Sequence, residues 1–267
     1  MTQHTPVQPA GLLNALGEVL PPLCIMLYGE RKRGKSMALL EAFPDGMFSG
    51  DAGNLQGVAA EFLNYTPNVL GHGEHTFASQ PRTLWDVNDL LDRGVKEGWI
   101  GYWPIWCFDD AGHIIETTHG MIQDPLPGKE KAGAFATTMR LIHFTMEKAR
   151  SLGVSTAWTL HEKGPHSTWA KEFRIGTAHL PSHNMGKQIS GWADIFARVT
   201  INPDLPNPYA DIEEGIKRGF FADPQSSEWI ASSRVGVIKR DTVGNLREVL
   251  RATRLSYRCG RVPGLEW

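Results

Sequence analysis

Cysteine is scarce in this chain of 267 residues, which contains only Cys24, Cys107 and Cys259. The three are too few and too scattered to form a disulfide framework, and no C-x-x-C pair is present. This usage excludes the small disulfide-stapled class of secreted proteins and favours a reducing, cytoplasmic setting.

Long apolar runs are also missing. No stretch approaches the roughly 18 uninterrupted apolar residues that a transmembrane helix needs. The N-terminus (MTQHTPVQPA) has no charged region followed by an apolar one, so we expect no signal peptide. We therefore predict a cytoplasmic protein with no membrane partner.

Net charge is nearly absent too, at −2 for the whole chain. No global basic field draws this protein to nucleic acid, so a DNA contact would need a local patch or assembly into an oligomer. With 41% hydrophobic residues, the chain can bury a sizeable core. Such a length suits one large domain, or one domain with an appended module.

Strand-like and helix-like segments alternate along most of the sequence. We expect residues 1–20 to form a tail and a short amphipathic helix, and residues 21–267 to form one domain. The predicted strands are continuous apolar runs, which is typical of buried parallel strands; they cover residues 23–28, 46–51, 102–110, 154–162 and 192–201. The predicted helices cover residues 35–43, 82–98 and 134–153. This order predicts an α/β fold with a mainly parallel sheet and helices on both faces.

Other segments give weaker signals. Residues 111–131 and 163–190 have the composition of surface loops, and residues 53–80 are ambiguous. Residues 233–240 and 247–255, separated by DTVGN, predict a C-terminal β-hairpin.

The strongest motif is GERKRGKS, from Gly29 to Ser36, which has the spacing G-x-x-x-x-G-K-[ST] of a phosphate loop. An apolar strand precedes it and a helix follows it, as that loop requires. Gly29 and Gly34 leave room for phosphate oxygens, which backbone amides and the helix N-terminus would bind. Lys35 would reach the terminal phosphates, and the Ser36 hydroxyl would bind Mg²⁺. We assign the whole loop to nucleotide binding, namely Gly29, Glu30, Arg31, Lys32, Arg33, Gly34, Lys35, Ser36 and Met37. The charged side chains in its middle fit equally well as solvated residues.

Two acids end the next recognisable strand, IWCFDD. A carboxylate at the end of a buried strand can hold Mg²⁺ or its water at the edge of the sheet where ligands bind. Asp109 directly follows the apolar run and is the predicted metal ligand. Asp110 is a candidate for polarising the attacking water, although it could equally cap the following element.

A further polar group is expected where the strand AWTLHE ends. This segment supplies Thr159, His161 and Glu162, of which His161 is the predicted sensor of the terminal phosphate. A purely structural histidine remains open. Asp51, at the end of the second predicted strand, is another candidate to face the nucleotide.

Other chemistries find less support. Two histidine pairs have ligand-like spacing, but no cysteine lies near them and H-E-x-x-H is absent, which argues against zinc. The segment from Trp99 to Trp106 could stack on bases, although a core strand explains it better. A basic C-terminal cluster could supply arginine fingers or contact a DNA backbone, or could be a solvated surface; it comprises Arg234, Lys239, Arg240, Arg247, Arg251, Arg254 and Arg258.

Taken together, GERKRGKS, CFDD, AWTLHE and GKQISGWADIFARV before a basic terminus resemble the RecA-type P-loop ATPases of bacteriophages, small AAA-family relatives of the recombinases. The similarity covers about residues 20–255. It implies a three-layer RecA-like core, ATP and Mg²⁺ as ligands, and a homo-oligomer, ring or filament, with nucleotide at subunit interfaces. It also implies a role with single-stranded DNA in recombination or annealing.

One departure concerns hydrolysis. The resemblance implies a glutamate just after the second core strand, where this chain has SGDAGN with Asp51. We therefore keep three hypotheses: an ATP hydrolase of DNA recombination, a DNA-packaging motor of the terminase type, and a nucleotide-binding regulatory module without turnover. The acid pair at Asp109 and Asp110 fits the motor, but the chain is too short for the nuclease domain that often accompanies one.

Overall fold

A computed structural model gives the structure of the chain. It describes residues 12–13, 21–127, 130–164, 166–167, 173–174, 176–201, 218–222, 230–233, 238–242, 246 and 258–259.

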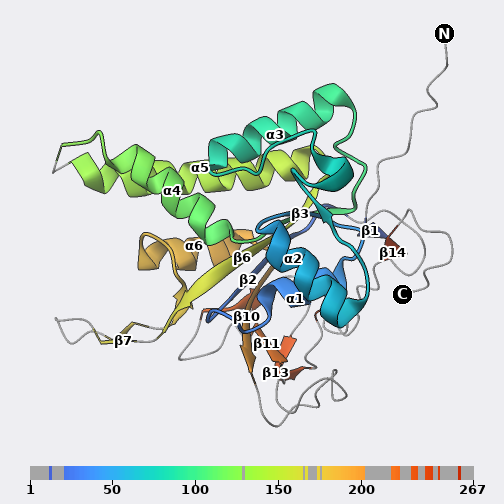
Figure 1. The fold of residues 1–267 in the computed structure, drawn as a ribbon. Coiled ribbons are helices and arrows are strands. Elements are labelled where there is room, and N and C mark those ends of the chain that lie inside the picture. Colours follow the sequence, from blue (N-terminus) through green and yellow to red (C-terminus); the bar gives the residue numbers. More distant parts are fainter. Residues whose placement is uncertain are drawn as a thin grey trace.

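A twisted sheet runs through the middle of the molecule (Figure 1). Its strand order is β13-β11-β10-β2-β6-β5-β3-β4, and the six strands from β10 to β4 are parallel to their neighbours. The parallel strands are β2 (Cys24–Gly29), β3 (Met47–Ser49), β4 (Asn68–Val69), β5 (Ile105–Phe108), β6 (Ser155–Lys163) and β10 (Ile195–Ile201). The antiparallel additions are β9 (Thr177–Ala178), β11 (Arg218–Ala222), β12 (Ser232–Ser233) and β13 (Ile238–Thr242). Strand β2, which leads into the loop from Gly29 to Ser36, therefore lies between β6 and β10.

Helices cover both faces of the sheet, which confirms the predicted fold class. On one face lie α3 (Leu84–Glu97), α4 (Ala111–Gln123), α5 (Lys131–Ser151) and α6 (His183–Trp192). On the other lie α1 (Lys35–Ala42), α2 (Ala52–Val58) and the π-helical turn η1 (Ala59–Leu63). Successive side chains of β2 point to opposite faces of the sheet and so contribute to both hydrophobic cores. Met26 and Tyr28 pack under helices α3 to α6, and Ile25 and Leu27 pack under α1.

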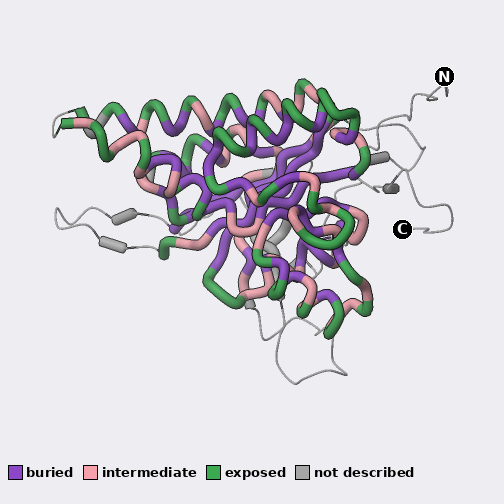
Figure 2. The backbone as a smooth tube through the Cα atoms, turned by 45° about the horizontal axis from the view of Figure 1, so that its top comes forward, coloured by how far each residue is buried: buried purple, intermediate pink, exposed green. Residues whose placement is uncertain are grey.

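Burial follows this layering. Strands β2, β3 and β5 are fully buried, and the outer helices alternate between buried and exposed turns, as expected for amphipathic helices (Figure 2). Helix α3 shows why such a segment starts and stops where it does: Thr83 and Asp86 form a capping box, and Gly98 ends the helix with φ of 80°. Within the described ranges, no helix is both long and apolar enough to cross a bilayer.

Two loop predictions were wrong. Residues 111–123 form α4, which Asp110 caps, and residues 183–192 form α6 inside the segment predicted as a loop. Both helices bury apolar residues against the sheet, including Ile114 and Ile115 of α4 and Ile189 of α6. Their glycines and β-branched residues have low helix propensity, but tertiary packing outweighs that preference.

The chain ends are only partly described. Leu12–Leu13 form β1, paired with β14 (Arg258–Cys259), at residues where the sequence predicts a helix. The first arm of the predicted hairpin contains β13, which pairs with β11, and the second arm lies outside the described residues. Two short elements complete the description: η2 (Gly73–His75), and a ribbon of β7 (His166–Ser167) with β8 (Phe173–Arg174).

Candidate nucleotide site

The loop from Gly29 to Ser36 joins β2 to α1 at the carboxyl edge of the parallel sheet. Gly34 has φ of 83° and ψ of 23°, in the left-handed region that favours glycine, and it directly precedes α1. Gly29 is required for another reason, because a Cβ there would collide with the backbone oxygen of Val199 on β10. The structure thus has the strand, glycine loop and helix that a phosphate loop needs.

Lys35 is the only lysine buried within the described residues, with 8% of its surface exposed. Its Nζ donates to the backbone oxygens of Gly29, at 3.0 Å, and Glu30, at 2.7 Å. Burial lowers the pKa of its ammonium, and the carboxylates of Asp109 and Asp110 oppose that shift. Two carbonyl groups of the loop therefore hold the Lys35 ammonium, which also interacts electrostatically with the two acids.

Ser36 and Asp109 meet, although 73 residues separate them in the sequence. The Ser36 hydroxyl donates to Asp109 Oδ2 at 2.6 Å, and the Thr159 hydroxyl donates to Asp109 Oδ1. These contacts bring together the C-terminal end of β5, the middle of β6 and the first turn of α1. A hydroxyl and a carboxylate are oxygen donors of the kind that Mg²⁺ prefers, so the residues fit the predicted metal.

Asp110 and His161 form a second contact at the same edge. His161 Nε2 lies 2.9 Å from Asp110 Oδ2. Asp110 Oδ1 accepts a hydrogen bond from the Gly112 amide at 2.9 Å, and Asp110 thereby caps α4. His161 Nδ1 is buried and has no hydrogen-bond partner among the described residues. His161 lies opposite Gly29 in the β2–β6 register, so this pair borders the loop from Gly29 to Ser36.

Asp51 makes no contact with these residues. Its side chain is exposed and accepts from the Asn54 amide at 3.2 Å, so it caps α2. Asp51 still lies near the site in the fold, because the Asp109 amide donates to the backbone oxygen of Ser49, which precedes Asp51 by two residues.

The charged middle of the loop points to solvent. Glu30, Arg31 and Lys32 are exposed, and Arg33 Nε donates to Glu30 at 2.7 Å. Met37 is partly buried in α1. Among the described hydrogen bonds and ion pairs, therefore, none joins these side chains to Lys35, Ser36 or the two acids.

Thr159 is the contact that sequence reasoning did not select, since it chose His161 from the same strand. Alternation along β6 puts Thr159 and His161 on one face, two residues apart, and this signal could have selected both. Glu162 points to the other face and binds Arg198 of β10, at 2.8 Å and 3.2 Å. It therefore joins strands on either side of β2 and takes no part in the Asp109 cluster.

The structure describes the tryptophan segment but not the side chains of the basic C-terminal cluster. Trp99, Trp103 and Trp106 are buried in one aromatic cluster with Phe77, which confirms the core interpretation for these three, but only Trp106 lies in a strand and Tyr102 is exposed. In the described part of the chain, no three His, Cys, Asp or Glu residues are arranged to hold a metal ion. The side chains of the basic C-terminal cluster lie outside what the structure describes.

Comparisons with known proteins add a distant likeness in structure. No protein-family model matches the sequence, and no curated protein matches it. Among solved structures, the chain is similar to a KaiC-like protein from the hyperthermophilic archaeon Pyrococcus horikoshii OT3. The two share 13% identity with a TM-score of 0.41, over 81% of this chain and 88% of that one.

Proposed function

We propose that this chain is a P-loop ATPase that binds ATP with Mg²⁺ at the carboxyl edge of its sheet. The observation that carries this proposal is the contact of Ser36 with Asp109, because it joins the phosphate-loop hydroxyl to the strand-end carboxylate. Those two oxygens are the pair that would share a Mg²⁺ ion. Thr159 holds the carboxylate from its other oxygen and would orient it.

Each residue of the loop has a separate task in this proposal. Backbone amides from Gly29 to Ser36 would bind phosphate oxygens, and Lys35 would exchange two carbonyl partners for the terminal phosphates. Mg²⁺, when bound, would neutralise charge that builds up between these phosphates. Two carbonyl groups of the loop already hold the Lys35 side chain, so phosphate binding would cost little additional side-chain entropy.

We propose Asp110 as the residue that polarises the attacking water, with His161 as its positioning residue. Asp110 lies at the same strand end as Asp109, and its carboxylate is held from two directions, by His161 and by the Gly112 amide. Asp51 is the weaker candidate because it caps α2 and lies exposed.

The proposed role of the ATPase is in DNA recombination or single-strand annealing, as a homo-oligomer. The sequence resemblance to phage RecA-type ATPases supports it, as does the basic character of the C-terminal segment, which could contact a phosphate backbone. A packaging motor and a module without turnover remain the competing functions.

Nucleotide binding and hydrolysis test the proposal. A fluorescent ATP analogue should bind the wild type with Mg²⁺, and Lys35→Ala should reduce binding or turnover at least tenfold by removing the phosphate-binding cation. Asp109→Asn should reduce Mg²⁺-dependent turnover more than it reduces nucleotide binding. Lys96→Ala is the control, because Lys96 is an exposed lysine of α3, which packs on the sheet face opposite α1. Wild-type affinity and rate in Lys35→Ala would refute the phosphate-loop assignment.

Asp110 and the DNA partner are tested separately. Asp110→Asn should lower turnover by about a hundredfold or more while nucleotide still binds, whereas Asp51→Asn should leave turnover within about twofold. The reverse ranking would transfer the role to Asp51. Stimulation of turnover by single-stranded DNA supports recombination, stimulation only by duplex DNA favours a motor, and tight binding without turnover under any condition favours the regulatory module.

A further inference from the structure

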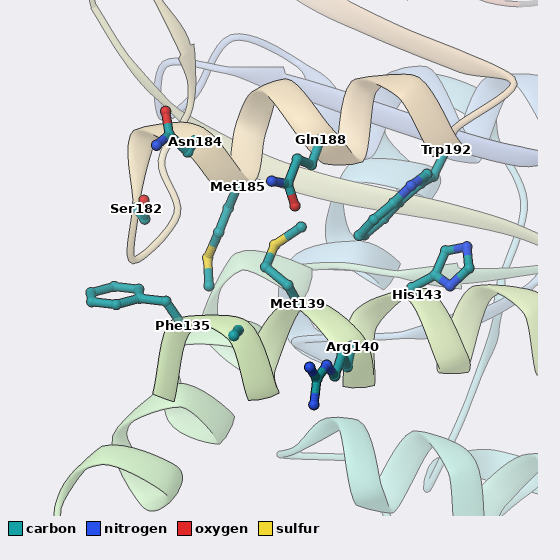
Figure 3. A pocket seen from close by; sticks show the side chains of 10 residues that line it. Phe135, Met139, Arg140, His143, Ser182, Asn184, Met185, Gln188 and Trp192 are labelled. Atoms are coloured by element: carbon teal, nitrogen blue, oxygen red, sulfur yellow. The ribbon is translucent and has the colours of Figure 1, made fainter. Parts of the chain in front are cut away.

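A cleft lies between α5 and α6, away from the phosphate loop (Figure 3). It has a volume of about 540 Å³, within the range of about 300–1,000 Å³ that binding pockets occupy. Helices α5 and α6 pack on the face of the sheet opposite α1, so a ligand in this cleft would not contact the phosphate-loop helix. The lining comprises Phe135, Ala136, Met139, Arg140, His143, Ser182, Asn184, Met185, Gln188 and Trp192.

Apolar side chains form much of the cleft, and the α6 side also carries Ser182, Asn184 and Gln188. Met139 and Met185 approach each other from the two helices, Phe135 closes one end, and Trp192 lies at the other (Figure 3). The Trp192 ring is fixed by His143, with ring centroids 4.6 Å apart. Methionine side chains adapt to differently shaped apolar partners, and aromatic side chains give large contact areas, so this lining suits a protein side-chain ligand.

The charge of the cleft has one sign. Arg140 and His143 are the only ionisable residues that line it. Arg140 is exposed and makes no ion pair or hydrogen bond within the described residues. The nearest acids along α5 and α6, Glu147 and Asp194, are both bound to Arg150, at 2.6 Å and 3.0 Å. Arg140 therefore lies at the edge of the cleft, with its guanidinium on the side of α5 away from α6 (Figure 3), where it complements a carboxylate of an occupant that also covers α5.

The length of the cleft indicates the shape of its ligand. At a rise of 1.5 Å per residue, the α5 wall from Phe135 to His143 is about 12 Å long, and the α6 wall from Ser182 to Trp192 is about 15 Å. Two turns of a helix span about 11 Å and present apolar side chains at i, i+4 and i+7 along one face.

We propose that the cleft between α5 and α6 is a docking site for an acidic amphipathic helix of a partner protein. The apolar face of that helix packs on Met139, Met185 and Trp192, and a carboxylate next to that face pairs with Arg140. This site is independent of the nucleotide site, and the proposal stands whether or not the chain hydrolyses ATP.

A labelled peptide tests this proposal directly. The probe is a fluorescein-labelled helical peptide of about 16 residues, with Leu at i, i+4 and i+7 and Glu residues beside them. A matched peptide carries Lys in place of Glu. Fluorescence polarisation should show that the wild type prefers the Glu peptide by about threefold to fivefold, the range of an exposed ion pair. Arg140→Glu should reverse that preference, while Lys96→Glu, a charge reversal on an exposed residue of α3, should leave it unchanged.

A second variant separates the cleft from general charge effects. Ala136→Trp places a large ring at an exposed position of the lining, and it should weaken binding of both peptides at least tenfold while the melting temperature stays near the wild-type value. Three outcomes would each overturn the proposal. The first is equal binding by wild type and Ala136→Trp, and the second is no binding of either peptide up to about 1 mM. The third is a preference that does not change in Arg140→Glu. Self-association of the wild type that Ala136→Trp abolishes would also overturn it, because a second copy would then be the occupant.

Discussion

Replacing Thr159 by valine tests whether the Asp109 carboxylate is held as the structure indicates. The substitution keeps the branched shape of a side chain that is 1% exposed, so it leaves no cavity. It removes only the hydroxyl that donates to Asp109 Oδ1. Asp109 keeps its second partner, Ser36, and thus remains at the end of β5.

The size of the effect follows from the type of bond that is lost. A hydrogen bond to a charged group contributes about 1.5–3 kcal/mol. Asp109 is only partly buried, so water can replace part of the lost donor, and we take the lower end, about 1.5 kcal/mol. For a domain of this size, each kcal/mol lowers the melting temperature by about 2–4 °C. The expected decrease for Thr159→Val is therefore about 3–6 °C.

Two assays follow from this number. Thermal unfolding monitored by circular dichroism, without nucleotide or metal, measures the stability change alone. If the proposed metal site is correct, the Mg²⁺ concentration for half-maximal turnover should also rise about 10–100-fold, the usual effect of losing a residue that orients a metal ligand. Thr137→Val is the control, because Thr137 is exposed on α5 and its hydroxyl bonds only to a helical carbonyl.

The two readouts can fail separately. A melting temperature equal to that of the wild type and of Thr137→Val would refute the stabilising role of the Thr159 hydroxyl. A destabilised variant whose Mg²⁺ dependence does not change would instead keep the bond as a structural one and remove Thr159 from the proposed metal site.

Further predictions concern packing and thiol chemistry. Gly186→Ala should destabilise the protein, because the added Cβ would overlap the Thr177 side chain. Gly191→Ala lies in the same helix, and its Cβ meets no described atom within 4 Å, so this substitution should stabilise the protein by up to about 1 kcal/mol. Urea unfolding would measure both changes. Burial raises the pKa of the Cys24 thiol to about 12 and holds that of Cys107 well above its ordinary value. Neither thiol should react with a thiol reagent at pH 8 until the protein is unfolded, and early labelling of either would contradict this burial. Because the unfolded chain ionises these thiols first, they should lower the free energy of unfolding as pH rises above about 9 towards 12.

Sequence patterns predicted the central strands because those strands are buried on both faces. The runs around Ile25, Cys107 and Ala157 are nearly continuous in apolar residues, and no other environment needs such a run at this length. Helices α4 and α6 escaped prediction because their glycines resemble loop signals. Gly186 shows the cause: it lets α6 approach Thr177 of β9 closely, a requirement that comes from tertiary packing and not from the helix itself.

The contacts of the candidate site were likewise predictable only in part. Spacing along the chain was enough to predict that Ser36 and Asp109 belong to one site, because both follow from the geometry of a parallel sheet and its carboxyl edge. Thr159 was harder to select, since a threonine inside an apolar strand is also what strand propensity favours. The Asp110–His161 pair depends on how α4 begins, and a segment taken for a loop could not reveal it.

The contact between Gly29 and Val199 has a consequence for how this protein is studied and how its sequence can change. The two residues are 170 positions apart, yet any side chain at position 29 would push β10 away from β2 and open the sheet between them. A Gly29 variant that fails to bind nucleotide would therefore be uninformative, since it would fail to assemble its sheet first. For the same reason, a descendant of this chain could replace Gly29 only together with a change in β10, so the first residue of the loop and the last core strand should vary as a pair.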